Sequence, residues 1–191
     1  EEMMARYKVP GVSIAVVDHG EIIWARGFGV KEVGRKDKVS ANTLFQAASI
    51  SKPISATAML RLVEQNKLSL DAPINSYLKS WHLPENEYTK TEQVSLRRLV
   101  SHTAGLNVHG FPGYAVGAQL PTVPQILDGK SPANTEAVRV VLTPGSTWQY
   151  PGGGTTIMQL AMTDTTGKPF PALMQELVLK PLGMHHSAYE Q

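Results

Sequence analysis

The sequence predicts an α+β protein in which one N-terminal β-hairpin precedes a mostly helical chain. Two strand-like runs, residues 12–17 and 22–29, flank the turn Asp18-His19-Gly20, which is the pattern of a hairpin. The remainder of the chain carries helix and turn signals, so these two strands are all the sheet that we expect from it. A short helix ending near Lys8 is expected first, and Val9-Pro10-Gly11 breaks it.

The main helix is expected to begin at or just before Ser49 and to continue to about Asn66. Its apolar residues recur at helical spacing and predict a buried stripe: Ile54, Ala58, Met59 and Leu62. Further helices are expected at 94–100, 122–129, 133–142, 155–166 and 170–180. Residues 107–121 are rich in Gly and Pro and predict a surface loop.

Composition bounds the class of protein. The 191 residues suffice for one large or two small domains, and 42% hydrophobic with 18% charged residues is typical of a globular chain. A net charge of +2 without a basic run longer than two residues gives no nucleic-acid signal. The absence of cysteine excludes disulfides and thiolate metal sites, and no apolar run is long enough to span a bilayer.

Ser49 and Lys52 are the first candidates for catalysis, because residues three apart at a helix start share one face. A serine hydroxyl becomes a useful nucleophile when a base lies within hydrogen-bond reach, and burial lowers the pKa of a lysine toward that role. The helix N-terminus also directs free N–H groups at a developing anion. Small residues around the motif leave room for a substrate: Ala47, Ala48, Ser55, Ala56 and Ala58.

A second S-x-x-K, formed by Ser76 and Lys79, serves as an internal comparison. It lies on a short amphipathic segment and has no small residues around its serine. A single motif match of this length arises by chance, so we interpret Ser76 and Lys79 as surface residues.

Tyr150 is the third candidate. It follows the turn at Pro144-Gly145 and precedes three glycines, which allow another segment of backbone to approach closely. A nearby ammonium group favours the phenolate, so such a tyrosine can act as an acid or a base. The alternative interpretation is an ordinary half-buried tyrosine whose hydroxyl is hydrogen-bonded.

Five stretches, taken together and in order, resemble the serine β-lactamase and penicillin-binding-protein family, especially its class C, esterase and D-aminopeptidase branch. They are residues 9–16, 45–52, 99–106, 144–150 and 181–184. The resemblance implies a β-lactamase/transpeptidase-like α+β fold, with an antiparallel sheet flanked by helices plus a mostly helical region. It also implies that Ser49 attacks a carbonyl, that Lys52 assists as base, and that Tyr150 shuttles the proton to the leaving group.

The chain departs from the family pattern in two places. The Tyr-x-Asn motif is here Tyr150-Pro151-Gly152, so the amide side chain that helps to hold a substrate amide is missing. The Lys-Thr-Gly or His-x-Gly triad that lines the site opposite the serine is also missing from this chain. We therefore expect a C-terminal segment of the same protein to pair with the hairpin and to complete the site, including the oxyanion hole begun by the Ser49 N–H.

The expected organisation has three parts. Residues 1–59 form the N-terminal part of the α/β domain, 60–165 form the mostly helical region, and 166–191 form a return helix toward the α/β domain.

Other catalytic arrangements are less favoured. The chain has no G-x-S-x-G elbow of a Ser-His-Asp hydrolase, and His102 is interpreted as part of a turn that closes a helix. His185-His186 point apart on any regular element and are assigned to a solvated terminus. Glu64 and Asp71 are assigned capping or surface roles.

The sequence therefore predicts a serine hydrolase that acts through an acyl-enzyme on an ester, amide or β-lactam carbonyl. The expected partner is a small-molecule or peptide substrate, and neither a metal nor an organic cofactor, nor nucleic acid, is implied. Family analogy favours an exported or periplasmic location. The alternative is a non-catalytic binding or scaffold protein with the same fold, for which the missing asparagine and triad are the main support.

Overall fold

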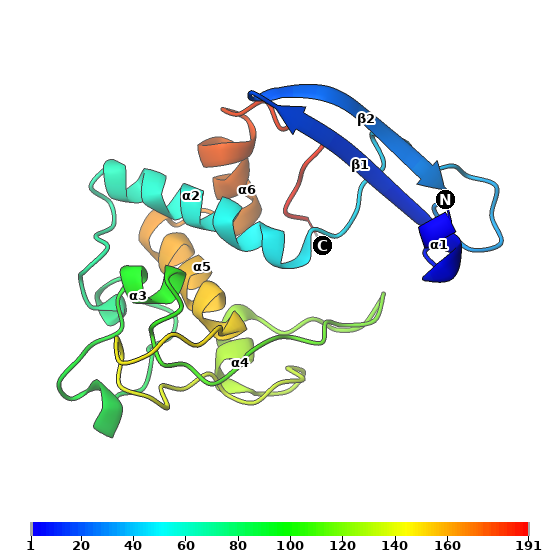
Figure 1. Cartoon of the computed structure of the whole chain (residues 1–191). Helices are drawn as coiled ribbons and strands as arrows, with labels where there is room; N and C mark the ends of the chain where they lie inside the picture. The colour runs from blue at the N-terminus through cyan, green and yellow to red at the C-terminus, as the bar shows by residue number, and fades with distance from the viewer. Residues whose placement is uncertain (1, 191) are drawn as a thin grey trace. The chain divides into compact units, whose positions relative to one another are not determined.

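The computed structural model describes residues 2–190, which form two compact units (Figure 1). The first unit runs to Ala48 and the second begins at Ser49. The three-part division expected from the sequence stays a prediction. None of the helices within the described range has the length and apolar character that a membrane crossing requires.

The first unit confirms the predicted hairpin. It contains α1 (Glu2–Arg6), β1 (Gly11–Asp18) and β2 (Glu21–Gly29). The strands pair antiparallel, with Gly11 opposite Gly29 and an irregularity in register between Val16 and Val17. His19 and Gly20 both have positive φ angles, of 49° and 82°, which is the backbone that a two-residue hairpin turn requires.

The segment after the hairpin packs against its strands. Among residues 2–48, Val39 is the one that is buried, and a Cβ on Gly27 would lie only 2.3 Å from the Val39 carbonyl oxygen. Glycine is therefore required at this close approach. Within the described residues the sheet has two strands, and large apolar side chains on it are exposed: Ile14, Val16, Val17, Ile22, Ile23 and Trp24.

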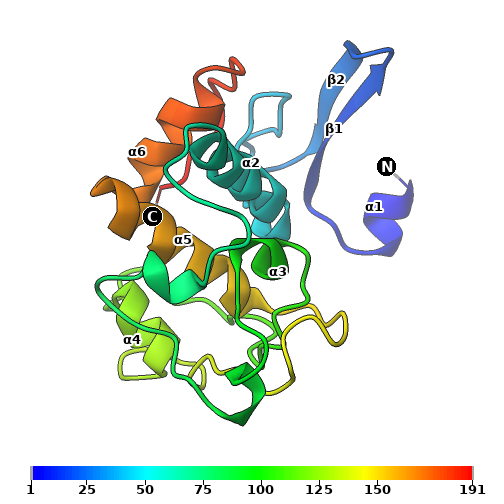
Figure 2. The same cartoon turned by 90° about the vertical axis from the view of Figure 1, so that its left-hand side faces the viewer.

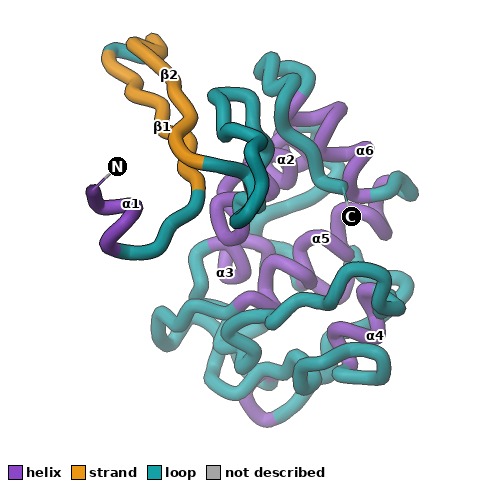
Figure 3. Tube along the Cα trace, turned by 90° about the vertical axis from the view of Figure 1, so that its right-hand side faces the viewer, coloured by secondary structure: helices purple, strands orange, loops and turns teal. Residues whose placement is uncertain are grey.

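The second unit is helical with long irregular connections (Figure 3). A 3-10 turn at Ala48–Ile50 leads into α2 (Ser51–Glu64). The later helices are α3 (Leu96–Val100), α4 (Val123–Asp128), α5 (Gly152–Thr166) and α6 (Phe170–Met174), the last continued by a π-helical turn at Gln175–Leu179. Short 3-10 turns occur at Ile74–Ser76 and Glu87–Thr89.

Helix α5 is the centre of this unit, since it contacts α2, α3, α4 and α6 (Figures 1 and 2). Its buried side chains recur with helical spacing and form part of one continuous apolar core: Ile157, Met158, Leu160, Ala161 and Met162. The predicted stripe of α2 supplies Ala58, Met59 and Leu62 to the same core. The direct packing of α2 on α5 is what later brings the two parts of the site together.

The prediction of a helix at 133–142 was wrong. Residues in this stretch are irregular, and Leu106 and Val140 form an isolated antiparallel bridge. Val138 and Val140 are buried while Arg139 between them is not, so the burial repeats every second residue as in a strand. The loop expected at 107–121 is confirmed, because no helix or strand is present there.

We predict that Leu99→Ala lowers the free energy of unfolding by about 2–5 kcal/mol, because it opens a cavity in the core around α5. Leu99 is 2% exposed, whereas Leu60 on α2 is 47% exposed. Leu60→Ala is therefore the matched control and should change the stability by about 0.5 kcal/mol or less. Urea denaturation of both variants measures the difference, and equal losses would contradict the assigned core.

Candidate active site

Ser49 lies in the 3-10 turn that precedes α2, and its side chain is exposed. The preceding residue, Ala48, has a left-handed φ of 45°, a conformation that costs a non-glycine residue about 1–2 kcal/mol. The start of α2 is fixed from the far end of the unit, because the Tyr189 hydroxyl donates to the Ser51 carbonyl at 2.7 Å and lies 3.1 Å from the Ser55 hydroxyl. Ser49 is thus presented by a short strained turn on a firmly held helix.

The structure brings Ser49, Lys52 and Tyr150 together. The Lys52 Nζ donates to Ser49 Oγ at 3.1 Å, and the Tyr150 hydroxyl donates to the same oxygen at 2.9 Å. Lys52 Nζ also lies 5.2 Å from the centre of the Tyr150 ring. The serine oxygen therefore sits between two groups that can exchange protons with it.

The ammonium group of Lys52 changes the acidity of Tyr150. The pKa of Tyr150 is lowered from the ordinary tyrosine value. The largest cause is Lys52, and the next is the hydrogen bond with Ser49. A nearby cation stabilises the phenolate, so the tyrosine releases its proton more readily than a tyrosine in water. This is the electrostatic state that a proton shuttle needs.

The backbone around Tyr150 is held by the segment 102–109. The Gln149 N–H donates to the His102 carbonyl at 2.9 Å, and the Gly152 N–H donates to the His109 carbonyl at 3.0 Å. His109 Nδ1 lies 2.8 Å from the Tyr150 carbonyl, so that nitrogen carries the proton, because a carbonyl can only accept. The backbone is therefore held by hydrogen bonds before, at and after Tyr150.

His102 lies against the site, although the sequence pointed only to a turn. Its backbone has a φ of 60°, and its ring centre lies 4.6 Å from that of Tyr150. The Trp148 ring meets the imidazole edge to face at 6.1 Å. His102, His109 and Trp148 are the site neighbours that sequence reasoning missed; the signal available for His102 was its place in the stretch 99–106.

The surroundings of Gly152 leave little room for a larger side chain in place of the asparagine of Tyr-x-Asn. A Cβ at this position would lie 3.1 Å from the His109 carbonyl oxygen and 3.2 Å from a ring carbon of Phe111. A side chain at this position would therefore make tight contacts with the neighbouring loop, which would have to shift by a few tenths of an ångström. The departure from Tyr-x-Asn is accommodated by this loop.

A cavity of about 160 Å³ lies beside Lys52. It is lined mostly by apolar groups, with Lys52, His102 and Thr155 as its polar side chains; the others are Pro53, Ala56, Leu99, Val100, Gly154 and Met158.

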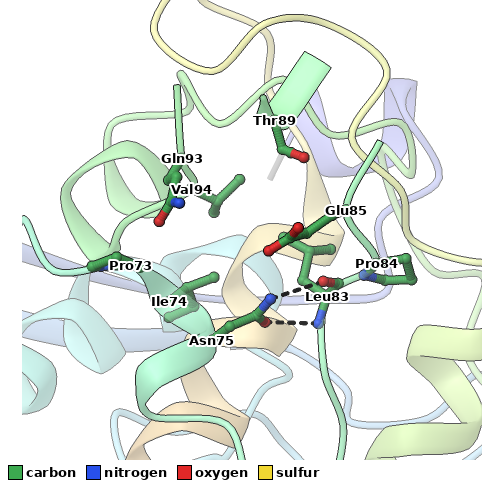
Figure 4. A pocket seen from close by; sticks show the side chains of 9 residues that line it. All are labelled: Pro73, Ile74, Asn75, Leu83, Pro84, Glu85, Thr89, Gln93 and Val94. Carbon is green, nitrogen blue, oxygen red and sulfur yellow. Dashed lines mark hydrogen bonds between the residues drawn. The ribbon is translucent and has the colours of Figure 1, made fainter. Parts of the chain in front are cut away.

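A second cavity, of about 130 Å³, has no part in this arrangement (Figure 4). Its wall includes Asn75, whose side chain is bonded in both directions to the backbone of Leu83. Of the neighbouring second S-x-x-K, Ser76 and Lys79 are both exposed, and Ser76 donates to the Pro73 carbonyl at 2.6 Å. Their interpretation as surface residues is confirmed.

The remaining candidates are also at the surface. Asp71 forms a two-pronged ion pair with Arg97 at 2.6 and 2.8 Å, and Glu64 pairs with Arg61. His185 and His186 are exposed. Within residues 2–190, no three His, Cys, Asp or Glu side chains are grouped as metal ligands would be.

Comparisons with known proteins show the family and the fold of the chain. The model of the family described as Beta-lactamase matches residues 1–191. The esterase EstB of Burkholderia gladioli is 29% identical over 197 residues, which cover 99% of this chain and 49% of EstB. The chain thus spans about half the length of that relative.

Two solved structures are similar over nearly the whole chain. A penicillin-binding protein homologue from Pyrococcus abyssi, described as octameric, has a TM-score of 0.75 at 25% identity and covers 96% of this chain and 41% of its own. EstCE1, described as a hydrolase with promiscuous acyltransferase activity, has a TM-score of 0.75 at 26% identity, with coverages of 95% and 49%. These similarities confirm the α+β, β-lactamase/transpeptidase-like fold class.

We predict that Gly152→Ala lowers the free energy of unfolding by about 1–3 kcal/mol, because its new methyl group overpacks against His109 and Phe111. Gly154→Ala, two residues along the same helix, is the control. Its Cβ would find ordinary contacts at 3.5 Å or more, so this variant should be neutral or stabilised by up to about 1 kcal/mol. Denaturant titration compares them, and a tolerated Gly152→Ala would refute the steric account.

We also predict that Lys52→Met raises the pKa of Tyr150, because removal of the cation removes stabilisation of the phenolate. Lys79→Met is the control, since Lys79 belongs to the exposed second motif. The pKa is read from tyrosinate absorbance as a function of pH, as a difference against Tyr150→Phe in each background. An unchanged titration in Lys52→Met would rule out this coupling.

Proposed function

Because the chain belongs to the β-lactamase family, we propose that the protein is a serine hydrolase that forms an acyl-enzyme on an ester, amide or β-lactam carbonyl. The single observation that carries the proposal is the pair of hydrogen bonds converging on Ser49 Oγ, from Lys52 and Tyr150. A nucleophile needs a general base within this distance, and Lys52 or Tyr150 can be that base once it has lost its own proton.

In the proposed reaction, the Lys52–Tyr150 pair first loses one proton to solvent, and Ser49 Oγ then bonds to the carbonyl carbon as it gives its own proton to that pair. The bond to the leaving group then breaks, and the leaving group takes that proton. Water repeats the attack on the acyl-enzyme, releases the acid and restores the serine hydroxyl. The Ser49 N–H is proposed as one donor to the oxyanion.

The division of work between Lys52 and Tyr150 follows from their charges. The lowered pKa of Tyr150 supports the tyrosine as the shuttle that carries the proton to the leaving group. Lys52 lies close to both Ser49 and the tyrosine ring, so it can act as base directly or stabilise the phenolate that forms when Tyr150 loses its proton. Either way the proton moves within this pair.

Gly152 bears on the class of substrate. Without an amide side chain at this position, the described residues offer less to an amide or lactam than a family member with asparagine would. We therefore propose esters as the preferred substrates within the three carbonyl classes. The name of EstB, an esterase, supports the same order.

We further propose that another segment of the same protein completes the sheet and the site. The hairpin has two strands, with exposed apolar residues such as Val17 and Ile22, and an isolated hairpin is marginal in water. Relatives of about twice this length leave room for such a segment. The rival, a binding protein without turnover, has no need of the Ser49–Lys52–Tyr150 arrangement.

The test is intact mass after treatment of the full-length protein with a fluorophosphonate and, separately, with a penicillin. We predict a stoichiometric fluorophosphonate adduct that is lost in Ser49→Ala and kept in Ser76→Ala, the matched serine of the second motif. Tyr150→Phe should slow labelling by about 10²–10⁴-fold, the usual loss of an acid or base.

The pattern of labelling distinguishes the ester preference, the wider enzyme proposal and the binding-protein alternative. Labelling by the fluorophosphonate alone favours the ester preference, whereas an equally stable penicillin adduct removes it. If folded protein takes up neither reagent, the enzyme proposal fails and the binding protein replaces it.

A further inference from the structure

We propose that His102 is a positioning residue, whose imidazole ring packs against Tyr150 and keeps the tyrosine hydroxyl on Ser49. The proposal rests on the proposed function, since it concerns the same nucleophile and the same shuttle. His102 makes no hydrogen bond to either reacting group, so it acts through Tyr150.

The backbone already ties His102 to Tyr150. The His102 carbonyl accepts the N–H of Gln149, the residue before the tyrosine, and Thr103 accepts the N–H of Gly145 at 2.7 Å. His102 follows Ser101, the C-cap of α3, and has a left-handed φ of 60°. A residue in such a conformation persists only where its surroundings hold it.

The imidazole contacts two aromatic rings. It lies 4.6 Å from the Tyr150 ring at a tilt of 50° and meets Trp148 at 85°. Its Nδ1 is buried and has no hydrogen-bond partner. An unpaired buried nitrogen costs stability, so stability alone does not account for a histidine at this position.

The charge of His102 also suits the task. Burial first, and then the Lys52 ammonium, lower the pKa of the imidazole, so the ring is neutral near pH 7. Of the groups that face it, Lys52 on α2 carries charge, Tyr150 is titratable, and Trp148 and Thr155 are neutral. A neutral ring leaves Lys52 as the cation that governs the phenolate.

The cavity beside Lys52 shows what removal of the ring would permit. His102 forms part of its wall, so truncation of the imidazole enlarges a space of about 160 Å³ beside Lys52 and removes a ring that contacts Tyr150. Tyr150 could then tilt and lengthen its 2.9 Å bond to Ser49. A displacement of about 1 Å at a reacting group can cost about 10²-fold in rate.

The experiment measures the rate of fluorophosphonate labelling in the full-length protein, per labelled site. His102→Asn keeps a side chain that tolerates left-handed backbone but removes the ring, and we expect labelling to slow by about 10–10²-fold. His102→Phe keeps a ring and should label faster than His102→Asn. His82→Asn, at an exposed histidine, is the control and should label as the wild type does.

A double-mutant cycle separates positioning from general damage. In a Tyr150→Phe background, His102→Asn should change the rate by no more than about twofold, because the hydroxyl that it positions is already gone. A full additional loss in that background, or a wild-type rate in His102→Asn alone, would overturn the proposal. Equal loss in His102→Asn and His102→Phe would also overturn it, because the nitrogen rather than the ring would then matter.

The two proposals fail in different ways. If Tyr150→Phe labels as fast as the wild type, the shuttle role in the proposed function is wrong, whatever His102 does. If Tyr150→Phe is slow and His102→Asn is not, the shuttle stands and the positioning role falls.

Discussion

The packing of the first turn of α5 against residues 108–109 is the constraint on which the rest of the site depends. Gly152 and Gly153 donate their N–H groups to the His109 and Val108 carbonyls. These hydrogen bonds fix the path of the backbone that follows Tyr150. Helix α5 also packs on α2, which carries Lys52 and follows Ser49. The serine and the tyrosine, 101 residues apart, meet because these two contacts share one helix.

The hydrogen bonds at Ser49 show which groups hold a proton before the serine reacts. Both Lys52 and Tyr150 donate to the serine oxygen, so each still holds its proton. Activation requires one of them to lose that proton first and then to accept the one from serine. The lowered pKa of Tyr150 reduces the cost of this step, and the neutral His102 adds no second cation that would compete with Lys52. Acidity and geometry thus favour the same proton path.

Local features of the chain were readable from sequence, and contacts between distant segments were not. The hairpin, the start of α2 and the exposed second motif follow from turn residues and apolar spacing within a few positions. The helix expected at 133–142 failed because tertiary pairing of Val140 with Leu106 overrode helix propensity. Ser49 and Tyr150 were joined by family resemblance rather than by spacing. The contact of His102 with Tyr150 left no local signal, since it depends on how two loops pack.

The filling of the space beside Gly152 by the main chain of residues 109–110 and by Phe111 makes two parts of the sequence interdependent. A mutation that restored asparagine alone would meet backbone, which cannot rotate away as a side chain can. Acceptance of the new side chain would therefore require a shift of this loop of a few tenths of an ångström. A change of substrate preference at position 152 thus involves the loop at 109–111 as well as the point mutation.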